Sequence, residues 1–305
     1  MCIRFSLFSS FTLPRIIAYG LSAGNDVSVN GTVAIVIRQS YVRHMLGFVP
    51  QLAKPSFSLV TETRGRHELM TKDEIRESVW SAIEQAGAAH TKKVHDRIPF
   101  FRGADEAALR IFELEVWQNA RVIKGNPDKP QGPLRQRALE QGKTVYMAVP
   151  RLKQERCFVE LDPAVMLGSP AEASTISGAF KHGRLMDMAD MKPVDLVISG
   201  SVAVNRMGVR IGKGGGFADL EYGLAVAAGV VLPETPVIGT VHSLQVLEQE
   251  LPWTHHDVCL DYIATPEEMI ECHLTMPRPT GIYWEDLSEA KIRQIPALQK
   301  LRAAL

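Results

Sequence analysis

The chain has 305 residues, of which 46% are hydrophobic and 22% charged, and its formal net charge is zero. This is the composition of an ordinary globular protein with enough residues for a proper core. Balanced charge does not indicate a nucleic-acid or membrane partner, and no apolar run approaches the roughly 18 residues of a membrane span. The four cysteines, at positions 2, 157, 259 and 272, lack zinc-site spacing, so we expect reduced, partly buried thiols.

Residues 1–70 differ in composition from the rest of the chain. They hold seven Lys or Arg and only three Asp or Glu residues. The segment is interpreted as a targeting presequence, as a disordered extension, or as sequence upstream of a true start at Met70. The last is favoured because Thr71 and Glu74 form a capping-box pattern directly after that methionine. We therefore predict an extension of doubtful structure over 1–70, and a folded domain over 71–305 that is cytoplasmic, or organellar if the presequence is real.

From Thr71 onwards the chain alternates between helix and strand patterns. Apolar residues recur with helical spacing over 72–86, and the run VDLVIS is typical of a strand buried on both faces. Helices are also predicted over 104–118, 131–141 and 217–228, and at both ends of 286–303 around Pro296. Strands are predicted over 120–125, 143–149, 194–199, 201–205, 209–211, 236–243 and 258–265, whereas 162–192 is weakly patterned. This alternation predicts one α/β domain with a largely parallel, helix-covered sheet.

The most distinctive motif is the loop GKGGG at 212–216. A P-loop requires GxxxxGK followed by Ser or Thr, but the stretch from Gly208 to Gly212 is one residue short and Gly214 follows Lys213. The dinucleotide fingerprint GxGxxG also fails, because Phe217 stands where its third glycine belongs. Neither of these nucleotide-binding templates therefore applies to the loop.

The general chemistry of such a loop still favours an anion. Consecutive glycines let backbone N–H groups turn inward without Cβ obstruction, and a helix that begins near Phe217 adds its free N–H groups. Lys213 and Arg210 add full charges. The loop therefore predicts a phosphate site, with a tight turn that holds no ligand as the alternative. Asp219, in the first helical turn, either interacts with the helix dipole or holds a magnesium ion that bridges phosphates.

Three segments follow one another along the chain: PVDLVISGSVAVNRMGVRIGKGGGFADLEYG, TPVIGTVHSLQV and LPWTHHDVCLDYIATPE. Their order resembles the 5-formyltetrahydrofolate cyclo-ligase family, also called methenyltetrahydrofolate synthetases. The matching residues are Gly212, Lys213, Gly214, Gly215, Gly216, Phe217, Asp219, Gln245, His256, Asp257, Asp261 and Thr265. The family also begins with a helix that bears Lys and, four residues on, Arg. Lys72 and Arg76 match this pattern on one helical face, although a solvated basic pair is the alternative.

The resemblance covers about residues 72–275. It implies a three-layer α/β/α sandwich with a mostly parallel sheet, ATP and Mg²⁺ binding, and a reduced folate as the small-molecule substrate. The implied phosphate cradle is Gly212–Gly216 with Phe217, gripped by Lys72 and Arg76. Lys213 and Arg210 are then the catalytic cations, and Asp219 holds magnesium with Asn205 as a weaker second ligand. His256 and Asp257 line the substrate side or fix its backbone.

Several positions depart from the family pattern. Asn205 replaces an aspartate, Ala218 and Leu220 replace the second tyrosine and the arginine of GYYDR, and the stretch 125–134 lacks the substrate-side glutamate. These departures are typical of a divergent, synthetase-domain-like branch. The predicted function is an ATP- and Mg²⁺-dependent 5-formyltetrahydrofolate cyclo-ligase. The alternatives are an ATP-dependent paralogue acting on another small substrate, and a nucleotide-binding protein without turnover.

The neighbouring histidines His255 and His256 invite a metal interpretation. Adjacent side chains in an extended segment point to opposite sides, so we expect the two rings to diverge. A loop in which His256 and Asp257 line the site is therefore favoured over a zinc centre.

Overall fold

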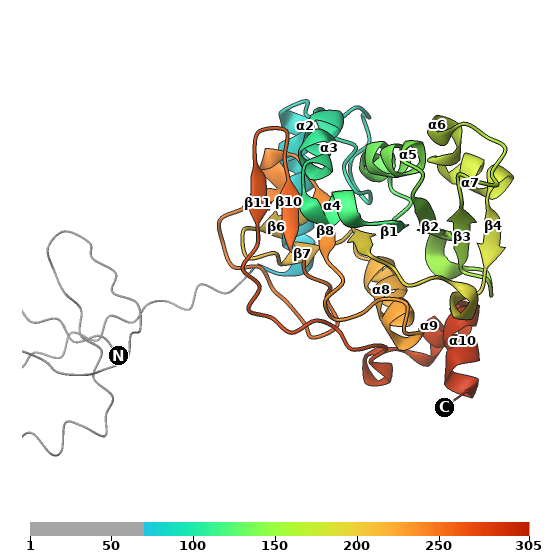
Figure 1. The fold of residues 1–305 in the computed structure, drawn as a ribbon. Coiled ribbons are helices and arrows are strands. Elements are labelled where there is room, and N and C mark those ends of the chain that lie inside the picture. Colours follow the sequence, from blue (N-terminus) through green and yellow to red (C-terminus); the bar gives the residue numbers. More distant parts are fainter. Residues whose placement is uncertain (1–69, 305) are drawn as a thin grey trace, which may run out of the picture. The chain divides into compact units, whose positions relative to one another are not determined.

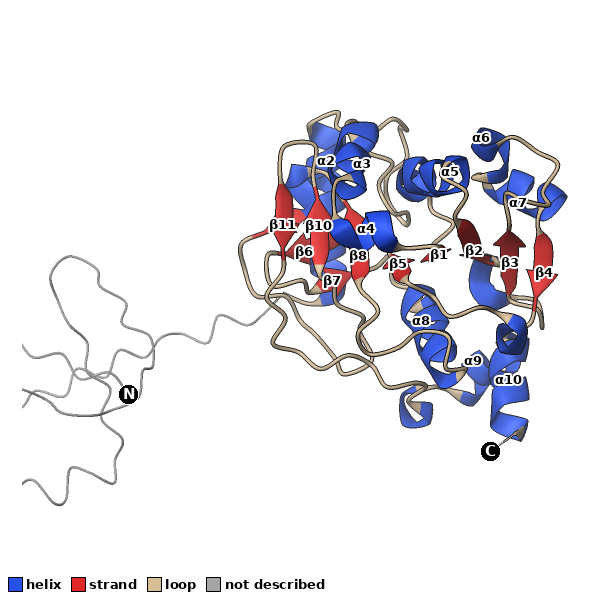
Figure 2. Ribbon diagram, in the orientation of Figure 1, coloured by secondary structure: helices blue, strands red, loops and turns tan. Residues whose placement is uncertain are grey.

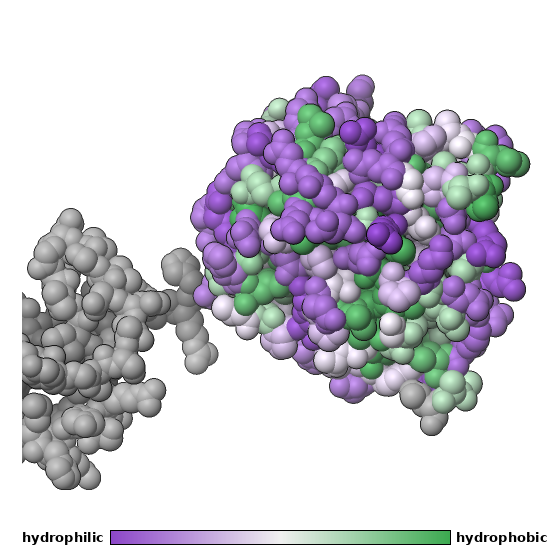
Figure 3. Space-filling view, in the orientation of Figure 1, coloured by the Kyte–Doolittle hydropathy of each residue, from purple (hydrophilic) through white to green (hydrophobic). Residues whose placement is uncertain are grey.

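The computed structural model describes residues 70–304, which belong to a unit of the chain that spans Glu68–Leu305. The predictions made for 1–69 lie outside the described residues. Within the described part, no helix is long and apolar enough to cross a membrane. Hydrophilic side chains cover most of the face seen in Figure 3, with apolar groups scattered between them.

Helices and strands alternate along most of the described chain (Figure 1). The helices are α2 (Lys72–Gln85), α3 (Ala104–Phe112), α4 (Glu115–Asn119), α5 (Gly132–Glu140), α6 (Pro170–Ala173), α7 (Ile176–His182), α8 (Phe217–Ala227), α9 (Glu289–Gln294) and α10 (Pro296–Ala303). The strands are β1 (Val122–Gly125), β2 (Thr144–Ala148), β3 (Phe158–Leu161), β4 (Arg184–Met186), β5 (Leu196–Ile198), β6 (Ala203–Asn205), β7 (Arg210–Ile211), β8 (Val237–Thr240), β9 (Val246–Leu247), β10 (Tyr262–Ala264) and β11 (Met269–Glu271).

The main sheet has eight strands in the order β11-β10-β8-β5-β1-β2-β3-β4. Its central strands, β10 to β2, pair in parallel, and antiparallel strands complete both edges. Ile123 in β1 pairs with Val145 on one side and Leu196 on the other, and its side chain is fully buried. Strands covered on both faces need apolar residues throughout, which explains the continuous apolar runs of the sequence.

Helices cover both faces of this sheet, as Figure 2 shows. Trp117 and Leu134 belong to the core between the sheet and the helices α3 to α7. Tyr222 and Leu298 belong to the core on the opposite face, under α8, α9 and α10. The predicted three-layer α/β/α sandwich with a mostly parallel sheet is therefore confirmed.

A second, smaller sheet of order β7-β6-β9 packs under α2. β6 and β7, which correspond to the strands predicted over 201–205 and 209–211, pair antiparallel, and β9 pairs in parallel with β6. Ile75, Val79 and Ile83 of α2 pack against this sheet and are almost completely buried. The small sheet therefore holds α2 beside the loop that follows β7.

Some predicted elements have different limits in the structure. The helix predicted over 104–118 forms two helices, α3 and α4, because the backbone of Leu114 is extended and this residue is the N-cap of α4. The strand predicted over 258–265 is reduced to β10, because the N–H of Val258 bonds to the Asp219 carboxylate and that of Leu260 to the Gly208 carbonyl. The weakly patterned stretch 162–192 holds α6, α7 and β4.

Candidate functional site

The sheet has a switch point between β1 and β5. After β1 the chain adds β2 on one side, and it later adds β5 on the other side of β1. In open α/β sheets such a switch point leaves a crevice at the carboxyl ends of the strands, where ligands bind. Asn126 follows β1 and Gly200 follows β5, and the N–H of Gly200 donates to Asn126 Oδ1 at 3.0 Å. The topology therefore places a candidate site at this edge.

The glycine loop of residues 212–216 runs beside this crevice and leads into α8. Gly214 and Gly216 have φ angles of +98° and +65°, which L-residues with a side chain rarely adopt. Among the described residues, none of the N–H groups of Gly212–Gly216 donates a hydrogen bond to the protein. The first N–H groups of α8 also lack intrahelical partners by geometry, since the N–H of Leu220 is the one that reaches Gly216 O. The loop is therefore an open nest of donors suited to an anion.

Two cavities meet at this loop. The first, which we call the strand-end cavity, has a volume of about 500 Å³, and its lining includes Asn126, Asp128, Lys213, Phe217 and Glu221. The second, which we call the α2 cavity, has a volume of about 430 Å³, and its lining includes Lys72, Arg76, Gly214, His256 and Lys291. Both volumes are in the range of small-molecule sites. The sequence predicted one phosphate-binding loop, and in the structure this loop borders both cavities.

Helix α2 carries the two cations that the sequence placed on one face. The predicted capping box is confirmed, because Thr71 Oγ1 accepts from the Glu74 N–H and the Glu74 carboxylate accepts from the Thr71 N–H. Arg76 Nε donates to Gly212 O at 2.7 Å, which ties the helix to the glycine loop. Lys72 reaches the α2 cavity one turn earlier and pairs with Asp257. The structure therefore brings Lys72 and Arg76 to the loop.

Lys291 of α9 is a third cation at this cavity, and sequence reasoning missed it. Its Nζ donates to Gly215 O at 3.0 Å and lies 3.8 Å from the centroid of the Phe217 ring. Burial lowers the pKa of this lysine. It follows the glycine loop by 76 positions, and nothing in the local pattern of a polar helix distinguishes it from a solvated lysine.

Lys213 lies on the opposite side of the loop, in the strand-end cavity. Its Nζ pairs with Asp128 Oδ1 at 2.7 Å, and its side chain is 42% exposed. A half-exposed ion pair of this kind is worth little in solution, so the ammonium can exchange Asp128 for another anion at small cost. The predicted position of Lys213 at the site agrees with this geometry.

Arg210 requires a correction. Although it borders both cavities, its guanidinium is buried and committed to the protein. Nε donates to Val258 O at 3.0 Å, Nη1 to Gly200 O at 2.9 Å, and Nη2 to Asp219 Oδ1 at 2.6 Å. A guanidinium with these partners orders the loop and Asp219, so Arg210 positions the site and does not supply a free charge for a phosphate.

Asp219 and Asn205 differ in their fitness for a metal ion. Asp219 borders both cavities, and its Oδ1 accepts from Arg210 and from the Val258 N–H, whereas Oδ2 has no hydrogen bond among the described residues. Mg²⁺ is commonly held by one or two carboxylates together with substrate phosphates, so Asp219 fits. Asn205 does not: its Oδ1 accepts from the N–H groups of Met207 and Val209 in the β6–β7 turn, and it borders neither cavity.

A buried polar network forms one wall of the strand-end cavity, and sequence reasoning missed it. Glu221 of α8 accepts from Lys124 Nζ at 2.9 Å and from Asn126 Nδ2 at 2.6 Å. Burial raises the pKa of Glu221, and the charge of Lys124 opposes that shift. A carboxylate from α8 therefore reaches the stretch in which the sequence showed no glutamate. The sequence offered one signal for this network. Lys124 lies within the apolar run of β1, and a buried lysine needs an acidic or polar partner.

Arg135 of α5 holds the backbone of the same loop after β1. Its guanidinium donates to the carbonyl oxygens of Asn126 at 2.5 Å and Asp128 at 3.1 Å. Burial lowers its pKa to about 10, which leaves it charged at neutral pH. These bonds fix the backbone of Asn126 and Asp128, which both line the strand-end cavity.

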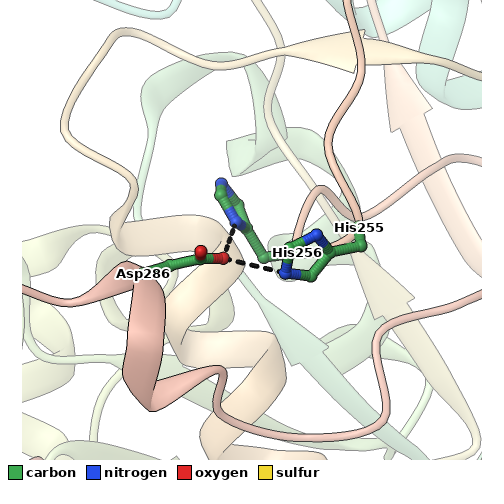
Figure 4. A group of neighbouring side chains, drawn as sticks. All are labelled: His255, His256 and Asp286. Atoms are coloured by element: carbon green, nitrogen blue, oxygen red, sulfur yellow. Dashed lines mark hydrogen bonds and ion pairs between the residues drawn. The ribbon is translucent and has the colours of Figure 1, made fainter.

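The predicted divergence of the two histidines is wrong. Residues 254–257 form a turn, in which the N–H of Asp257 donates to Thr254 O at 2.9 Å, so adjacent side chains need not alternate. Both rings reach Asp286, as Figure 4 shows. His256 and Asp257 border the α2 cavity and not the strand-end cavity. The carboxylate of Asp257 is occupied by Lys72 and Thr254.

Comparisons with known proteins agree with these features. A model of the 5-formyltetrahydrofolate cyclo-ligase family matches residues 69–266. The methenyltetrahydrofolate synthase domain-containing protein of Mus musculus is 38% identical over 239 residues, covering 77% of this chain and 64% of that protein. The protein of the same description from Homo sapiens is 37% identical over 239 residues, covering 77% of this chain and 62% of that protein. The chain thus spans a little less than two thirds of the length of these relatives.

Among solved structures, the NMR structure of Aquifex aeolicus 5,10-methenyltetrahydrofolate synthetase aligns with 66% of this chain and 93% of its own. The two share 18% identity at a TM-score of 0.43. A similarity of this size supports no inference about the site.

Proposed function

The chain belongs to the 5-formyltetrahydrofolate cyclo-ligase family, and on that premise we propose that it is an ATP- and Mg²⁺-dependent ligase that converts 5-formyltetrahydrofolate to 5,10-methenyltetrahydrofolate. One observation carries the proposal above the others. Within the described part of the chain, the amides of residues 212–216 have no hydrogen-bond partner, and they lie where two cavities of small-molecule size meet. Lys213 lies in one cavity, and Lys72 and Arg76 border the other. Such an arrangement suits the transfer of a phosphoryl group from a nucleotide in one chamber to a substrate in the other.

In this proposal the α2 cavity holds the triphosphate of ATP. Three cations border it, Lys72, Arg76 and Lys291, and the glycine amides add neutral donors that are fixed before binding. Asp219 would hold Mg²⁺ through its free Oδ2, and the ion supplies charge neutralisation on the phosphates. Phosphoryl transfer needs positioning and charge neutralisation more than a protein nucleophile, which fits a site without a catalytic triad.

The strand-end cavity holds the reduced folate. The Asn126 amide and the Glu221 carboxylate supply polar groups for a heterocycle, while Phe100 and Phe217 contribute apolar ring surface. The arrangement is supported by preorganisation, because Lys124 and Arg135 already hold Glu221 and Asn126 in place.

The reaction then has two steps. The formyl oxygen attacks the γ-phosphorus of ATP, a new P–O bond forms, and the bond between that phosphorus and the β–γ bridging oxygen breaks to release ADP. The nearby nitrogen N10, which links the pteridine to the aminobenzoyl group, attacks the activated formyl carbon and loses its proton. The C–O bond then breaks and inorganic phosphate leaves. Lys213 reaches the transferred group from the strand-end cavity and offsets its charge.

The test measures ADP formation and methenyltetrahydrofolate absorbance with ATP·Mg, with and without 5-formyltetrahydrofolate. The proposal expects ADP and methenyltetrahydrofolate in equal amounts, and no ADP without the folate. If ADP forms only with other small acceptors, the substrate is not 5-formyltetrahydrofolate. Ala218 and Leu220, which depart from the family pattern, would agree with that result. Nucleotide binding without turnover would reject an enzymatic function altogether.

A further inference from the structure

His255, His256 and Asp286 form a compact cluster at the rim of the α2 cavity. The histidines come from the turn of residues 254–257, and Asp286 from the short helical turn Trp284–Asp286 (Figure 4). Asp286 Oδ2 lies 2.9 Å from His255 Nε2 and 2.7 Å from His256 Nδ1. The three ligand-type atoms all lie within 4.8 Å of one another.

The way these groups share atoms is unusual for simple hydrogen bonding. Both imidazoles approach the same carboxylate oxygen, whereas Asp286 Oδ1 has no hydrogen bond among the described residues. Two rings that merely needed an acceptor could use one oxygen each, since a carboxylate offers about four lone-pair sites. Convergence of two ring nitrogens and one oxygen is the arrangement that surrounds a shared cation.

Neighbouring groups also fix the two rings. The second nitrogen of His256, Nε2, lies 3.1 Å from the hydroxyl of Thr254, and the ring of His255 meets Tyr283 edge-on at a centroid distance of 4.4 Å. Histidine ligands of metals commonly use their other ring nitrogen for such a bond, which sets the tautomer and the ring orientation. The Thr254 hydroxyl also bonds to Asp257, the partner of Lys72, so the cluster is tied to the cavity wall.

We propose that His255, His256 and Asp286 bind one Zn²⁺ ion, through Nε2, Nδ1 and Oδ2. Two imidazoles and one carboxylate make a donor set that favours zinc and its transition-metal neighbours over Mg²⁺. Tetrahedral zinc separates its ligand atoms by about 3.3 Å, so Oδ2 would have to move a few tenths of an ångström away from the two ring nitrogens, which lie 2.9 and 2.7 Å from it. Three protein ligands leave a fourth position for water or an anion.

This site shares no ligand with the proposed magnesium site at Asp219, although both border the α2 cavity, and it does not depend on the proposed reaction. Asp286 lies beyond residues 69–266, where the family model matches, so the complete ligand set is not part of the matched region. The bound ion would add positive charge to a cavity already bordered by Lys72, Arg76 and Lys291.

The test titrates Zn²⁺ into the full chain and follows binding by calorimetry. In a second titration Co²⁺ replaces Zn²⁺, and binding is followed by the visible absorption of Co²⁺, which is intense in tetrahedral sites. The variants are His255→Ala, Asp286→Asn, and the matched control His95→Ala. His95 is also a partly exposed histidine beside carboxylates, 3.1 Å from Glu77 and 3.5 Å from Glu84. The wild type and the control should bind one Zn²⁺ with the same affinity. Each ligand substitution should weaken binding by more than about 100-fold, the upper range for loss of an outer-shell partner, and abolish the Co²⁺ spectrum.

Histidines outside the described residues could also bind zinc, so the comparison between variants decides. Unchanged affinity in His255→Ala and Asp286→Asn, or no saturable binding in the wild type, would overturn the proposal. Thermal melting in the presence of EDTA checks folding. In EDTA, all three variants should have melting temperatures close to that of the wild type, because the substituted side chains are partly exposed, at 50% for His255, 29% for Asp286 and 32% for His95.

Discussion

At the scale of single residues, the site shows how burial decides what a positive charge can do. Arg210 and Lys213 lie three positions apart and carry the same charge, but the guanidinium is 1% exposed and the lysine side chain 42%. Buried charge must be paired and hydrogen-bonded, so Arg210 is committed to the fold. Lys213 keeps the freedom to exchange one anion for another, which a phosphate-binding residue needs.

Lys213→Ala should therefore separate activity from stability. We expect cyclo-ligase turnover to fall by about 10²–10³-fold, as for other positioned charge-stabilising groups. The melting temperature should hardly change, because a half-exposed ion pair contributes little. Lys181→Ala is the control, since Lys181 is also an exposed lysine in an ion pair, 2.8 Å from Glu172. Steady-state kinetics and thermal melting check both statements, and full turnover in Lys213→Ala would contradict the assigned role.

Asp257 gives a prediction about pH. Burial by itself would raise the pKa of this carboxyl, but hydrogen bonds from Lys72 and Thr254 outweigh it and bring the pKa below its ordinary value of 3.8. A lowered carboxyl pKa stabilises the fold fully above the unfolded pKa, and that stabilisation is lost as the pH falls through the folded one.

Asp257→Asn should accordingly lower the free energy of unfolding by about 1.5–3 kcal/mol near neutral pH, the range for hydrogen bonds to a charged group. The difference from the wild type should shrink as the pH falls below 3.8. Urea titrations at a series of pH values measure it. A difference that stays constant through this range would show that the charge of Asp257 is not what stabilises the turn.

At the scale of elements, the loop between β7 and α8 combines local backbone conformation with distant support. Gly214 and Gly216 supply the positive φ angles. Arg76 from α2 and Lys291 from α9 then hold the carbonyl oxygens of Gly212 and Gly215. With these carbonyls bonded outward, the N–H groups remain available for an anion.

Gly216→Ala tests the role of backbone conformation in this loop. No atom lies within 4 Å of the added Cβ, so the cost comes from the φ of +65° alone. We expect a loss of about 1–2 kcal/mol in unfolding free energy and weaker nucleotide binding. In the control Gly212→Ala, the new Cβ meets Arg210 at an ordinary 3.5 Å without a positive φ, and the loss should be smaller. Equal losses in urea unfolding would contradict this account.

At the scale of the whole molecule, the sheet buries apolar side chains on both faces, and the described cysteines lie in or beside these cores. Cys157, Cys259 and Cys272 are free and buried, as the sequence led us to expect. Burial raises their pKa values to about 12, 11 and 12, so these thiols stay protonated at physiological pH. Protonated, enclosed thiols react slowly.

A chain with Cys2→Ser should therefore show no fast thiol labelling when folded, and labelling of three thiols after unfolding. The slow labelling of the folded chain should speed up with denaturant in parallel with loss of structure, because the cores must open. A disulfide-exchange reagent followed by absorbance at about pH 8 measures this. Rapid labelling of any thiol in the folded chain would show that part of the core opens independently.

Much of the fold could be predicted from local patterns. The capping box at Thr71 and Glu74 and the apolar run of β5 both have the predicted structure. Each depends on interactions within a few residues or on burial of a whole segment. By contrast, β3 and β4 extend the edge of the sheet because β3 pairs antiparallel with β2 and β4 pairs antiparallel with β3. Their short segments carry too weak a pattern to be found locally.

In the candidate site, too, some features could be predicted from the sequence and others could not. The sequence by itself determined the glycine loop, which depends on residue type and spacing along one stretch, and the family, which depends on the order of several such stretches. Only the tertiary structure decided that Arg210 and Asn205 are committed to the protein, that Lys291 and Glu221 join the site, and that two histidines meet Asp286. A side chain's partners depend on which segments the fold brings within about 3 Å, and spacing along the chain does not contain that information.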